Sequence, residues 1–108
     1  MANAVTDNTA RRRFELVEDG FTAFANYRRS GSGLVIPHVE APLPLRGKGT
    51  AARLMEGVVA LARASGETIT PLCSYARTWF LRHPEHADLL SGDDSSGTVR
   101  AGRMFNNN

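Results

Sequence analysis

Apolar and polar residues alternate in two segments of the first thirty positions, and a third segment is rich in β-forming residues, so three strands are predicted. The predicted strands are Arg13–Glu18, Phe21–Arg28 and Leu34–Glu40. They are separated by Asp19-Gly20 and by Ser30-Gly31-Ser32-Gly33, which are typical of tight turns because glycine adopts positive φ at little steric cost. Short turns between successive strands predict an antiparallel meander.

Prolines interrupt this pattern from the third predicted strand onward. Pro37 lies inside that strand, and because proline has no N–H to donate, we expect the strand to be open or bulged there. The segment Ala41–Leu45 contains Pro42 and Pro44, so we expect it to be neither helix nor sheet.

Between Thr50 and Ser65 the spacing of apolar residues changes to that of an amphipathic helix. The residues that follow this spacing are Ala51, Leu54, Met55, Val58, Leu61 and Ala62. Gly66 is a favoured residue just beyond the end of a helix, so we expect the helix to stop there.

A strand over Glu67–Leu72 and a second helix over Tyr75–Arg82 are predicted next, and Pro84 ends that helix. Glu85–Leu90 is expected to add a helical turn. This order of elements predicts an α/β fold with an α+β-like mixed sheet. In it, the antiparallel meander leads into a β-α-β unit and a C-terminal helix.

The length of 108 residues suits one domain, which we expect at 10–90, between a flexible leader at 1–9 and a flexible tail at 91–108. The composition, 42% hydrophobic and 22% charged, is ordinary for a soluble protein. No apolar run is long enough to span a bilayer, and the first nine residues lack the apolar stretch of a secretory signal. We therefore expect a cytoplasmic monomer or weak homodimer with no membrane partner.

The formal net charge is +2, and the run Arg11-Arg12-Arg13 could contact phosphates. Glu15, Glu18 and Asp19 follow at once, however, and no basic stripe with interleaved aromatic residues appears. We therefore expect no nucleic-acid partner.

The single cysteine, Cys73, excludes an intrachain disulfide and a cysteine-rich zinc site. His83 and His86 flank Pro84 and make a poor pair of metal ligands. We therefore expect no metal.

The segment Pro44–Ala51 joins a predicted strand to the N-terminus of a predicted helix, and it carries the clearest chemical signal. Gly47 and Gly49 allow the backbone to approach a ligand closely. The helix that begins near Thr50 presents unpaired N–H groups and the positive end of its dipole. Three basic residues in and after the loop add positive charge: Arg46, Lys48 and Arg53. The ligand that such a loop suits is a phosphate or pyrophosphate.

Two other kinds of phosphate-binding loop fit less well. A P-loop needs a glycine in the five residues before Gly47, and there is none. The dinucleotide pattern G-x-G-x-x-[GA] is matched by Gly47, Gly49 and Ala52, with Glu67 as its acid. Glu67 lies at the start of its predicted strand, whereas the acid of the dinucleotide pattern lies at the end of a strand. A hairpin meander also precedes the loop, which the dinucleotide fold does not have there. A glycine-rich helix start without a ligand is the remaining alternative.

The run Arg46-Gly47-Lys48-Gly49-Thr50-Ala51 resembles the R-x-x-G-x-[GA] pyrophosphate loop of the GCN5-related N-acetyltransferases. Further motifs of the small single-domain subfamily of that family follow one another in the expected order between about Thr9 and Leu90. They are Phe14-Glu15-Leu16, Glu18-Asp19-Gly20, Tyr27-Arg28, His38-Val39-Glu40-Ala41-Pro42, Leu45-Arg46-Gly47-Lys48-Gly49, Pro71-Leu72-Cys73-Ser74-Tyr75 and His83-Pro84-Glu85. Val39 stands where that subfamily usually has threonine, and Ala41 where it usually has valine.

The resemblance implies a minimal fold of that family, in which the parallel strands Leu34–Glu40 and Glu67–Leu72 splay apart and pantetheine lies in the gap. It implies acetyl-CoA or coenzyme A as the cofactor. The cofactor-binding residues that it implies are Val39, Glu40, Ala41, Leu45, Arg46, Gly47, Lys48, Gly49, Thr50, Ala51, Cys73 and Tyr75.

Acetyl transfer to an amine needs a base, because only the neutral amine attacks a thioester. His38 and Glu40 are candidates, since they share one face of a strand near the loop; a packed histidine and a solvated carboxylate are the alternatives. Cys73 lies at a strand-to-helix junction and is a third candidate, or else a small buried residue. The family usually places a tyrosine in this helix to protonate the leaving thiolate. Phe80 stands there in this sequence, so Tyr75 or Cys73 is the candidate donor.

The activity that follows from the resemblance is N-acetyl transfer from acetyl-CoA to an amine, by direct attack in a ternary complex. A covalent acetyl-Cys73 mechanism is an alternative within the same class. A catalytically weak acyl-CoA-binding or regulatory module is the alternative outside it. The sequence leaves the acceptor open between a small-molecule amine and an amine of a peptide or protein.

Overall fold

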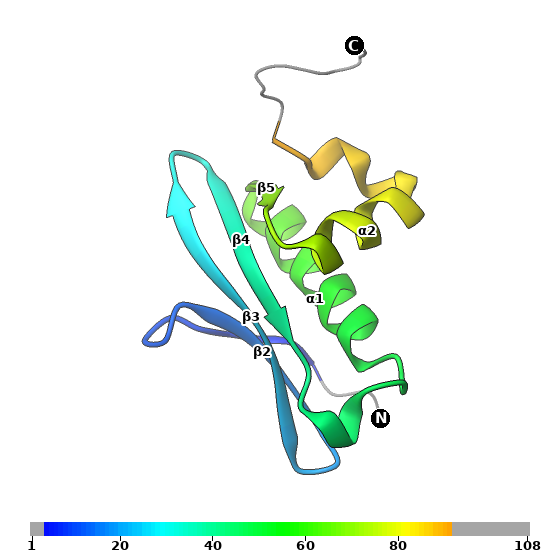
Figure 1. Cartoon of the computed structure of the whole chain (residues 1–108). Helices are drawn as coiled ribbons and strands as arrows, with labels where there is room; N and C mark the ends of the chain where they lie inside the picture. The colour runs from blue at the N-terminus through cyan, green and yellow to red at the C-terminus, as the bar shows by residue number, and fades with distance from the viewer. Residues whose placement is uncertain (1–3, 92–108) are drawn as a thin grey trace.

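The computed structural model describes residues 4–91, which form a five-stranded mixed sheet with two α-helices and two 3₁₀ helices (Figure 1). The strands are β1 (Thr6–Asn8), β2 (Arg13–Glu18), β3 (Phe21–Ser30), β4 (Gly33–Glu40) and β5 (Thr68–Pro71). The helices are α1 (Thr50–Ser65), α2 (Ser74–Arg82) and the 3₁₀ helices η1 (Leu43–Leu45) and η2 (Pro84–Leu89). The strands lie in the order β1-β2-β3-β4-β5, antiparallel as far as β4 and parallel between β4 and β5. This is the mixed α/β fold that the sequence predicted.

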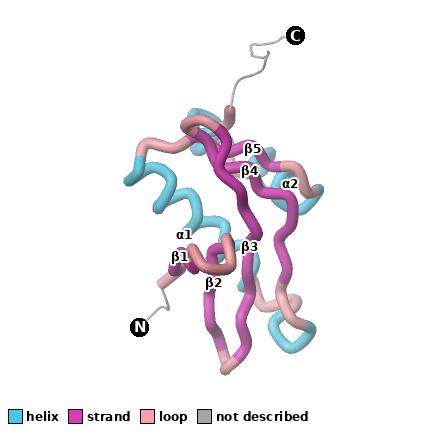
Figure 2. The backbone as a smooth tube through the Cα atoms, turned by 90° about the vertical axis from the view of Figure 1, so that its left-hand side faces the viewer, coloured by secondary structure: helices cyan, strands magenta, loops and turns pink. Residues whose placement is uncertain are grey.

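The main core lies between α1 and one face of the sheet. Alternate residues of β2 and β3 point to this face and are buried, and full burial of a large apolar side chain is worth about 1.5–3 kcal/mol. The buried strand residues are Phe14, Leu16, Ala23, Ala25 and Tyr27, and α1 meets them with Leu54, Met55, Val58, Val59 and Ala62. Figure 2 shows α1 on one side of β4 and β5 and α2 on the other. The two helices therefore cover opposite faces of the sheet at β5.

Strand β4 is bulged at Pro37, as its missing N–H predicted. Asn26 pairs with His38, but Arg28 pairs with Val35, so two steps along β3 correspond to three along β4. One extra residue in a strand reverses the alternation of its side chains between the two faces of the sheet.

The bulge decides which side chains of β4 face α1. Before it, Ile36 is fully buried in the core. After it, Val39 pairs with the buried Ala25 and packs against the core, whereas His38 and Glu40 lie on the opposite face. Strict alternation would have sent His38 and Glu40 to the same face as Ile36.

Strands β4 and β5 are paired over only part of their length. Gly33–Ile36 pairs with Thr68–Pro71, and the N–H of Leu72 donates to the carbonyl of Ile36 at 2.9 Å. Beyond this point β4 continues through Pro37–Glu40 while the other chain segment turns into α2. The expected gap between the two parallel strands therefore opens just after Ile36.

The N-terminal segment differs from the expected flexible leader over 1–9. Thr6–Asn8 pairs with β2 as strand β1, and Val5 packs against the core. A Cβ at Gly57 of α1 would overlap the side chain of Val5, so the glycine makes room for this packing. The expected tail at 91–108 lies outside the described residues from position 92 onward.

The proline-rich segment Ala41–Leu45 also differs from expectation, because Leu43–Leu45 forms the 3₁₀ helix η1. Pro44 lies at the start of this turn, where an N–H has no intrahelical partner and its loss costs nothing. Leu45 is buried, so η1 anchors the loop that follows to the core.

Candidate cofactor-binding site

The glycine loop before α1 has the backbone geometry of an anion-binding loop. Gly47 and Gly49 have φ angles of 77° and 80°, a left-handed conformation that residues with a side chain rarely adopt. Gly49 is the N-cap of α1, no side chain within residues 4–91 caps the helix there, and its first turn has no acidic residue. The N–H groups of that turn therefore lie at the positive end of the helix dipole without a side-chain acceptor.

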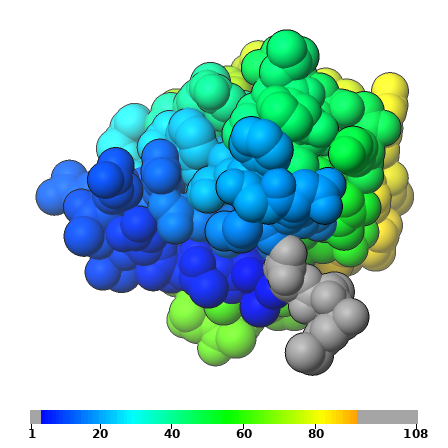
Figure 3. Space-filling view, turned by 90° about the horizontal axis from the view of Figure 1, so that it is seen from below, coloured from blue at the N-terminus to red at the C-terminus, as the bar shows by residue number. Residues whose placement is uncertain are grey.

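A carboxylate from the β2–β3 hairpin holds the start of α1. Glu18 accepts a hydrogen bond from the hydroxyl of Thr50 at 2.6 Å and two from the guanidinium of Arg53, at 2.7 and 2.8 Å. These bonds, that of Arg53 first, lower the pKa of Glu18 from its ordinary value to about 2. The space-filling view in Figure 3 shows the hairpin in blue and the loop region in green adjoining at this end of the molecule. Glu18 belongs to the motif Glu18-Asp19-Gly20, but no local pattern predicted its contact with Thr50, 32 positions later in the chain.

The positive charge at the loop is smaller than the sequence suggested. Arg53 is neutralised by the hairpin carboxylate. Lys48 lies 3.4 Å from Asp19 in an exposed ion pair, a kind that is usually worth less than about 1 kcal/mol. Arg46 forms no ion pair with any described residue, and its Nε donates to the carbonyl of Ala41 at 2.9 Å. Arg46 is therefore the loop cation best placed to contact a phosphate.

The loop and α2 together line a cavity of about 220 Å³. Its lining residues from the loop and the start of α1 are Ala41, Leu45, Arg46, Gly47, Gly49, Thr50, Ala51 and Ala52. Tyr75 of α2 completes the wall. Ala52 was not among the expected residues, and its place in the G-x-G-x-x-[GA] pattern was the signal for it. Four expected residues do not line this cavity: Val39, Glu40, Lys48 and Cys73.

Tyr75 presents a protonated hydroxyl beside this cavity. Its side chain is 40% exposed, and its partial burial raises the pKa of the hydroxyl. Arg82 opposes this rise in pKa and Cys73 adds to it. A hydroxyl that keeps its proton at neutral pH can donate a hydrogen bond or a proton.

Cys73 lies where β4 and β5 separate. Its N–H is 3.4 Å from the carbonyl of Ile36, the last paired residue of β4. It is the N-cap of α2, and its sulfur accepts a hydrogen bond from the N–H of Ala76 at 3.4 Å. The half-buried thiol thus has a structural partner in the helix that it begins.

His38 and Glu40 share a face, as the sequence predicted, and the Nε2 and Oε1 atoms are 2.9 Å apart. Their side chains are 54% and 46% exposed. They lie on the sheet face away from α1, beside Phe24, whose ring centroid is 6.3 Å from that of His38. The structure brings this pair together but does not bring it into the cavity at the loop.

The dinucleotide alternative fails on the position of its acid. Glu67 lies beyond the C-terminal end of α1 and pairs with Arg29 at 2.7 Å, whereas the glycine loop lies at the N-terminal end. Phe80 is 4% exposed and belongs to the core. Across residues 4–91, no helix is long and apolar enough to span a membrane, and no group of three or more His, Cys, Asp or Glu side chains could hold a metal ion.

Comparison with known proteins agrees with this geometry. A family model described as GCN5-related N-acetyl-transferase matches residues 13–89. Among solved structures, the fold matches the NMR solution structure of a GCN5-like candidate N-acetyltransferase from Staphylococcus aureus. The TM-score is 0.60 at 23% identity, over 87% of this chain and 94% of that chain. At this identity the likeness concerns the fold. No curated protein sequence matches the chain significantly.

Proposed function

This chain belongs to the GCN5-related N-acetyltransferase family, and from that premise we propose that it transfers an acetyl group from acetyl-CoA to an amine by direct attack in a ternary complex. The observation that supports this most strongly is the combination of two features. An uncapped helix start with left-handed glycines lines one cavity with Tyr75, and two parallel strands separate beside it.

The residues at the loop suit the anionic part of coenzyme A. The N–H groups of Gly47–Ala51 would hold the pyrophosphate, and Arg46 would add a charge-assisted hydrogen bond. On the β5 side, no strand within residues 4–91 pairs with the backbone of Val39–Ala41, which would hold the pantetheine arm. When bound, the cofactor supplies a thioester as the acyl donor.

The side chains around the gap can move the protons that the reaction requires. Glu40 would accept the proton of the attacking amine, and His38, hydrogen-bonded to it at 2.9 Å, would orient the carboxylate. The protonated hydroxyl of Tyr75 would donate to the departing sulfur, a role for which Phe80 has no proton. The N–C bond forms and the C–S bond breaks. The amine loses one proton and the departing thiolate gains one.

Substitution of Gly49 tests the placement of the cofactor. Valine at φ of 80° is strained, and its Cβ would lie 3.1 Å from the guanidinium of Arg53, so it obstructs the anion site. We expect Gly49→Val to weaken binding of coenzyme A at least about tenfold by calorimetry, the loss of roughly one charge-assisted hydrogen bond.

Gly66→Val is the matched control, because Gly66 ends the same helix with a φ of 74° and has no atom within 4 Å of its Cβ position. Both variants carry the same backbone strain, and both are checked for folding by circular dichroism. Equal affinity for coenzyme A in the two folded variants would remove the cofactor from this loop.

A release assay for free thiol separates an enzyme from a weak acyl-CoA-binding module. With acetyl-CoA and a panel of amines, the proposed function predicts turnover that depends on the acceptor. Tight binding of acetyl-CoA with no turnover for any acceptor would favour the binding module, which the absence of a tyrosine at Phe80 makes the second candidate.

A further inference from the structure

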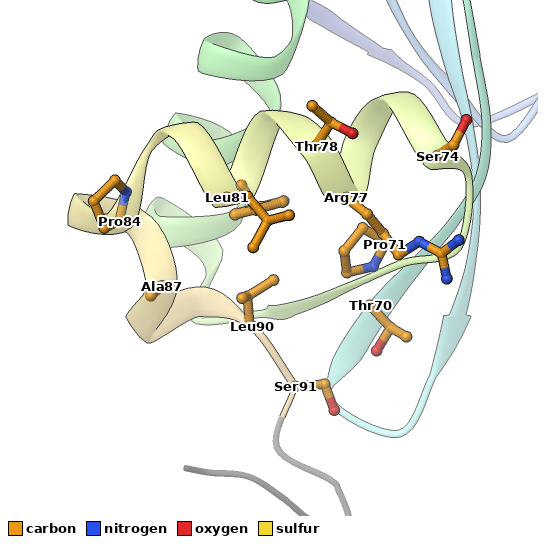
Figure 4. Close-up of a pocket in the computed structure, with 11 residues that line it drawn as sticks. Thr70, Pro71, Ser74, Arg77, Thr78, Leu81, Pro84, Ala87, Leu90 and Ser91 are labelled. Atoms are coloured by element: carbon orange, nitrogen blue, oxygen red, sulfur yellow. The ribbon is translucent and has the colours of Figure 1, made fainter. Parts of the chain in front are cut away.

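A second hollow lies on the other side of α2 from the cofactor loop. Its volume is about 680 Å³, within the range of roughly 300–1,000 Å³ typical of sites for small molecules, and it is bounded by α2, β5 and η2 (Figure 4). Its lining shares no residue with the loop cavity. Tyr75 lines the loop cavity, whereas its neighbour Ser74 lines this groove, so the first turn of α2 separates the two sites.

Among residues 4–91, the lining of the groove is mostly apolar, with one cation, Arg77, and no acid. Figure 4 shows Leu81 and Leu90 pointing toward each other across it, with Pro71 on its floor. Leu81 is 82% exposed, which leaves its side chain free to cover a ligand. Arg77 reaches past Pro71 toward β4 in Figure 4 and forms no ion pair with any described residue.

A stripe along α2 connects this groove to the gap between β4 and β5. Cys73, Arg77 and Leu81 are each four residues apart, a spacing that places them on one side of a helix, about 6 Å apart along its axis. Cys73 and Arg77 are joined by a backbone hydrogen bond, in which the N–H of Arg77 donates to the carbonyl of Cys73 at 3.1 Å. From the gap outward, the stripe therefore presents a thiol, a guanidinium and an apolar side chain.

The groove and the candidate base lie on the same side of the sheet. Thr70 lines the groove and pairs with Val35, which alternates with the buried Leu34 and Ile36 and so faces away from α1. His38 and Glu40 face the same way after the bulge. An acceptor held in the groove would thus approach the gap from the side that carries the carboxylate.

We propose that the acceptor is an α-amino acid with an apolar side chain, bound in this groove. Its carboxylate would pair with Arg77, its side chain would pack against Leu81 and Leu90, and its amine would point to the Cys73 end of the stripe. Because the amine and the carboxylate are attached to one carbon, pairing of the carboxylate with Arg77, whose side chain reaches toward β4, would keep the amine near the gap. This inference rests on the proposed acetyl transfer: the amine nitrogen displaces the thioester sulfur, giving an N-acetyl amino acid and the free thiol of coenzyme A.

The test compares acceptors that differ in one group, using the full chain and the release of free thiol. L-leucine and L-phenylalanine have all three groups, leucinamide and phenethylamine lack the carboxylate, and glycine lacks the apolar side chain. We expect KM for leucine and phenylalanine to be at least about tenfold lower than KM for leucinamide, phenethylamine and glycine. Each of these three acceptors would lose one charge-assisted contact or one apolar contact, and a loss of that size changes affinity about tenfold.

Arg77→Gln should raise KM for leucine about tenfold and leave that for leucinamide unchanged, because only leucine has a carboxylate for Arg77 to bind. Arg28→Gln is the control, since Arg28 is an exposed arginine of β3 and does not line the groove. Leu81→Ala should raise KM for phenylalanine and not for glycine. Turnover with an unchanged acceptor profile in Arg77→Gln and Leu81→Ala would overturn the inference and leave the proposed function intact.

A binding measurement keeps the inference testable without turnover. In protein saturated with coenzyme A, addition of L-phenylalanine should shift the amide NMR signals of Arg77, Leu81 and Leu90. Such shifts with no thiol release from any acceptor would uphold the site and reject the transfer reaction. No shift at these residues, including the case in which the segment after Ser91 fills the groove instead, would overturn the inference.

Discussion

Cys73 has a structural role that has to be separated from any chemical role of its thiol. Its sulfur caps α2 by accepting the N–H of Ala76, and serine at this position would keep that cap. Alanine would lose the cap, at a cost of about 1 kcal/mol. The variants Cys73→Ser and Cys73→Ala therefore separate the cap from any chemistry of the thiol.

For direct transfer, we expect Cys73→Ser to retain turnover within about fivefold of the parent protein, the size of one lost hydrogen bond. Intact-protein mass spectrometry after incubation with acetyl-CoA should then show no acetyl adduct, because exchange of one thioester for another gains little driving force. An adduct on Cys73 that an amine discharges, together with an inactive Cys73→Ser, would establish the covalent mechanism instead.

Glu18 is the second residue whose substitution is informative. Its pKa falls from 4.5 to about 2 in the folded protein because Arg53 and Thr50 bind the carboxylate. A lowered pKa means that the stabilisation is complete above about pH 4.5 and is lost as the pH falls toward 2. We expect Glu18→Gln to lower the melting temperature at pH 7, and the difference from the parent protein to shrink over this acidic range.

Glu56→Gln is the control for this comparison, because Glu56 is an exposed glutamate of α1 with no ion pair among the described residues. It should melt like the parent protein at both ends of the range. A Glu18→Gln deficit that stays constant down to pH 2 would show that the carboxylate charge does not hold the loop.

At the scale of elements, α1 is fixed at its two ends and in its middle. Its start is tied to the β2–β3 hairpin, its end is closed by Gly66, and its middle packs under the N-terminal segment at Gly57. For the helix alone, Gly57 would be destabilising, since glycine inside a helix costs about 1 kcal/mol relative to alanine.

The packing of Val5 on α1 predicts that Gly57→Ala destabilises the protein. Helix propensity favours this substitution, but the added Cβ would overlap the Val5 side chain, so we expect a lower melting temperature by calorimetry. Val5→Ala in the same protein should restore part of the loss. A higher melting temperature in Gly57→Ala alone would mean that the N-terminal segment does not pack on α1 in solution.

At the scale of the whole molecule, the two candidate binding sites lie on two sides of the gap between β4 and β5. The glycine loop and Tyr75 form one cavity, and the groove along α2 lies beyond the first turn of that helix. In the proposed reaction the cofactor and the acceptor therefore reach the gap separately, as a ternary complex requires.

The sequence by itself determined the elements and the loop. The period of two, the change to helical spacing at Thr50–Ser65 and the glycines before it are local patterns, and local backbone preferences follow from them directly. Pro37 likewise predicted that the strand is open or bulged, because a missing N–H is a property of one residue.

Only the tertiary structure decided which distant residues meet. Glu18 reaches the start of α1, Tyr75 closes the loop cavity, and the bulge turns Glu40 to the face opposite the core. Periodicity shows that a residue faces one way or the other relative to its own element, but it carries no information on which element packs there. That choice depends on strand register and on the packing of segments far apart in the chain, which is why the proposed acceptor site could be inferred only from the fold.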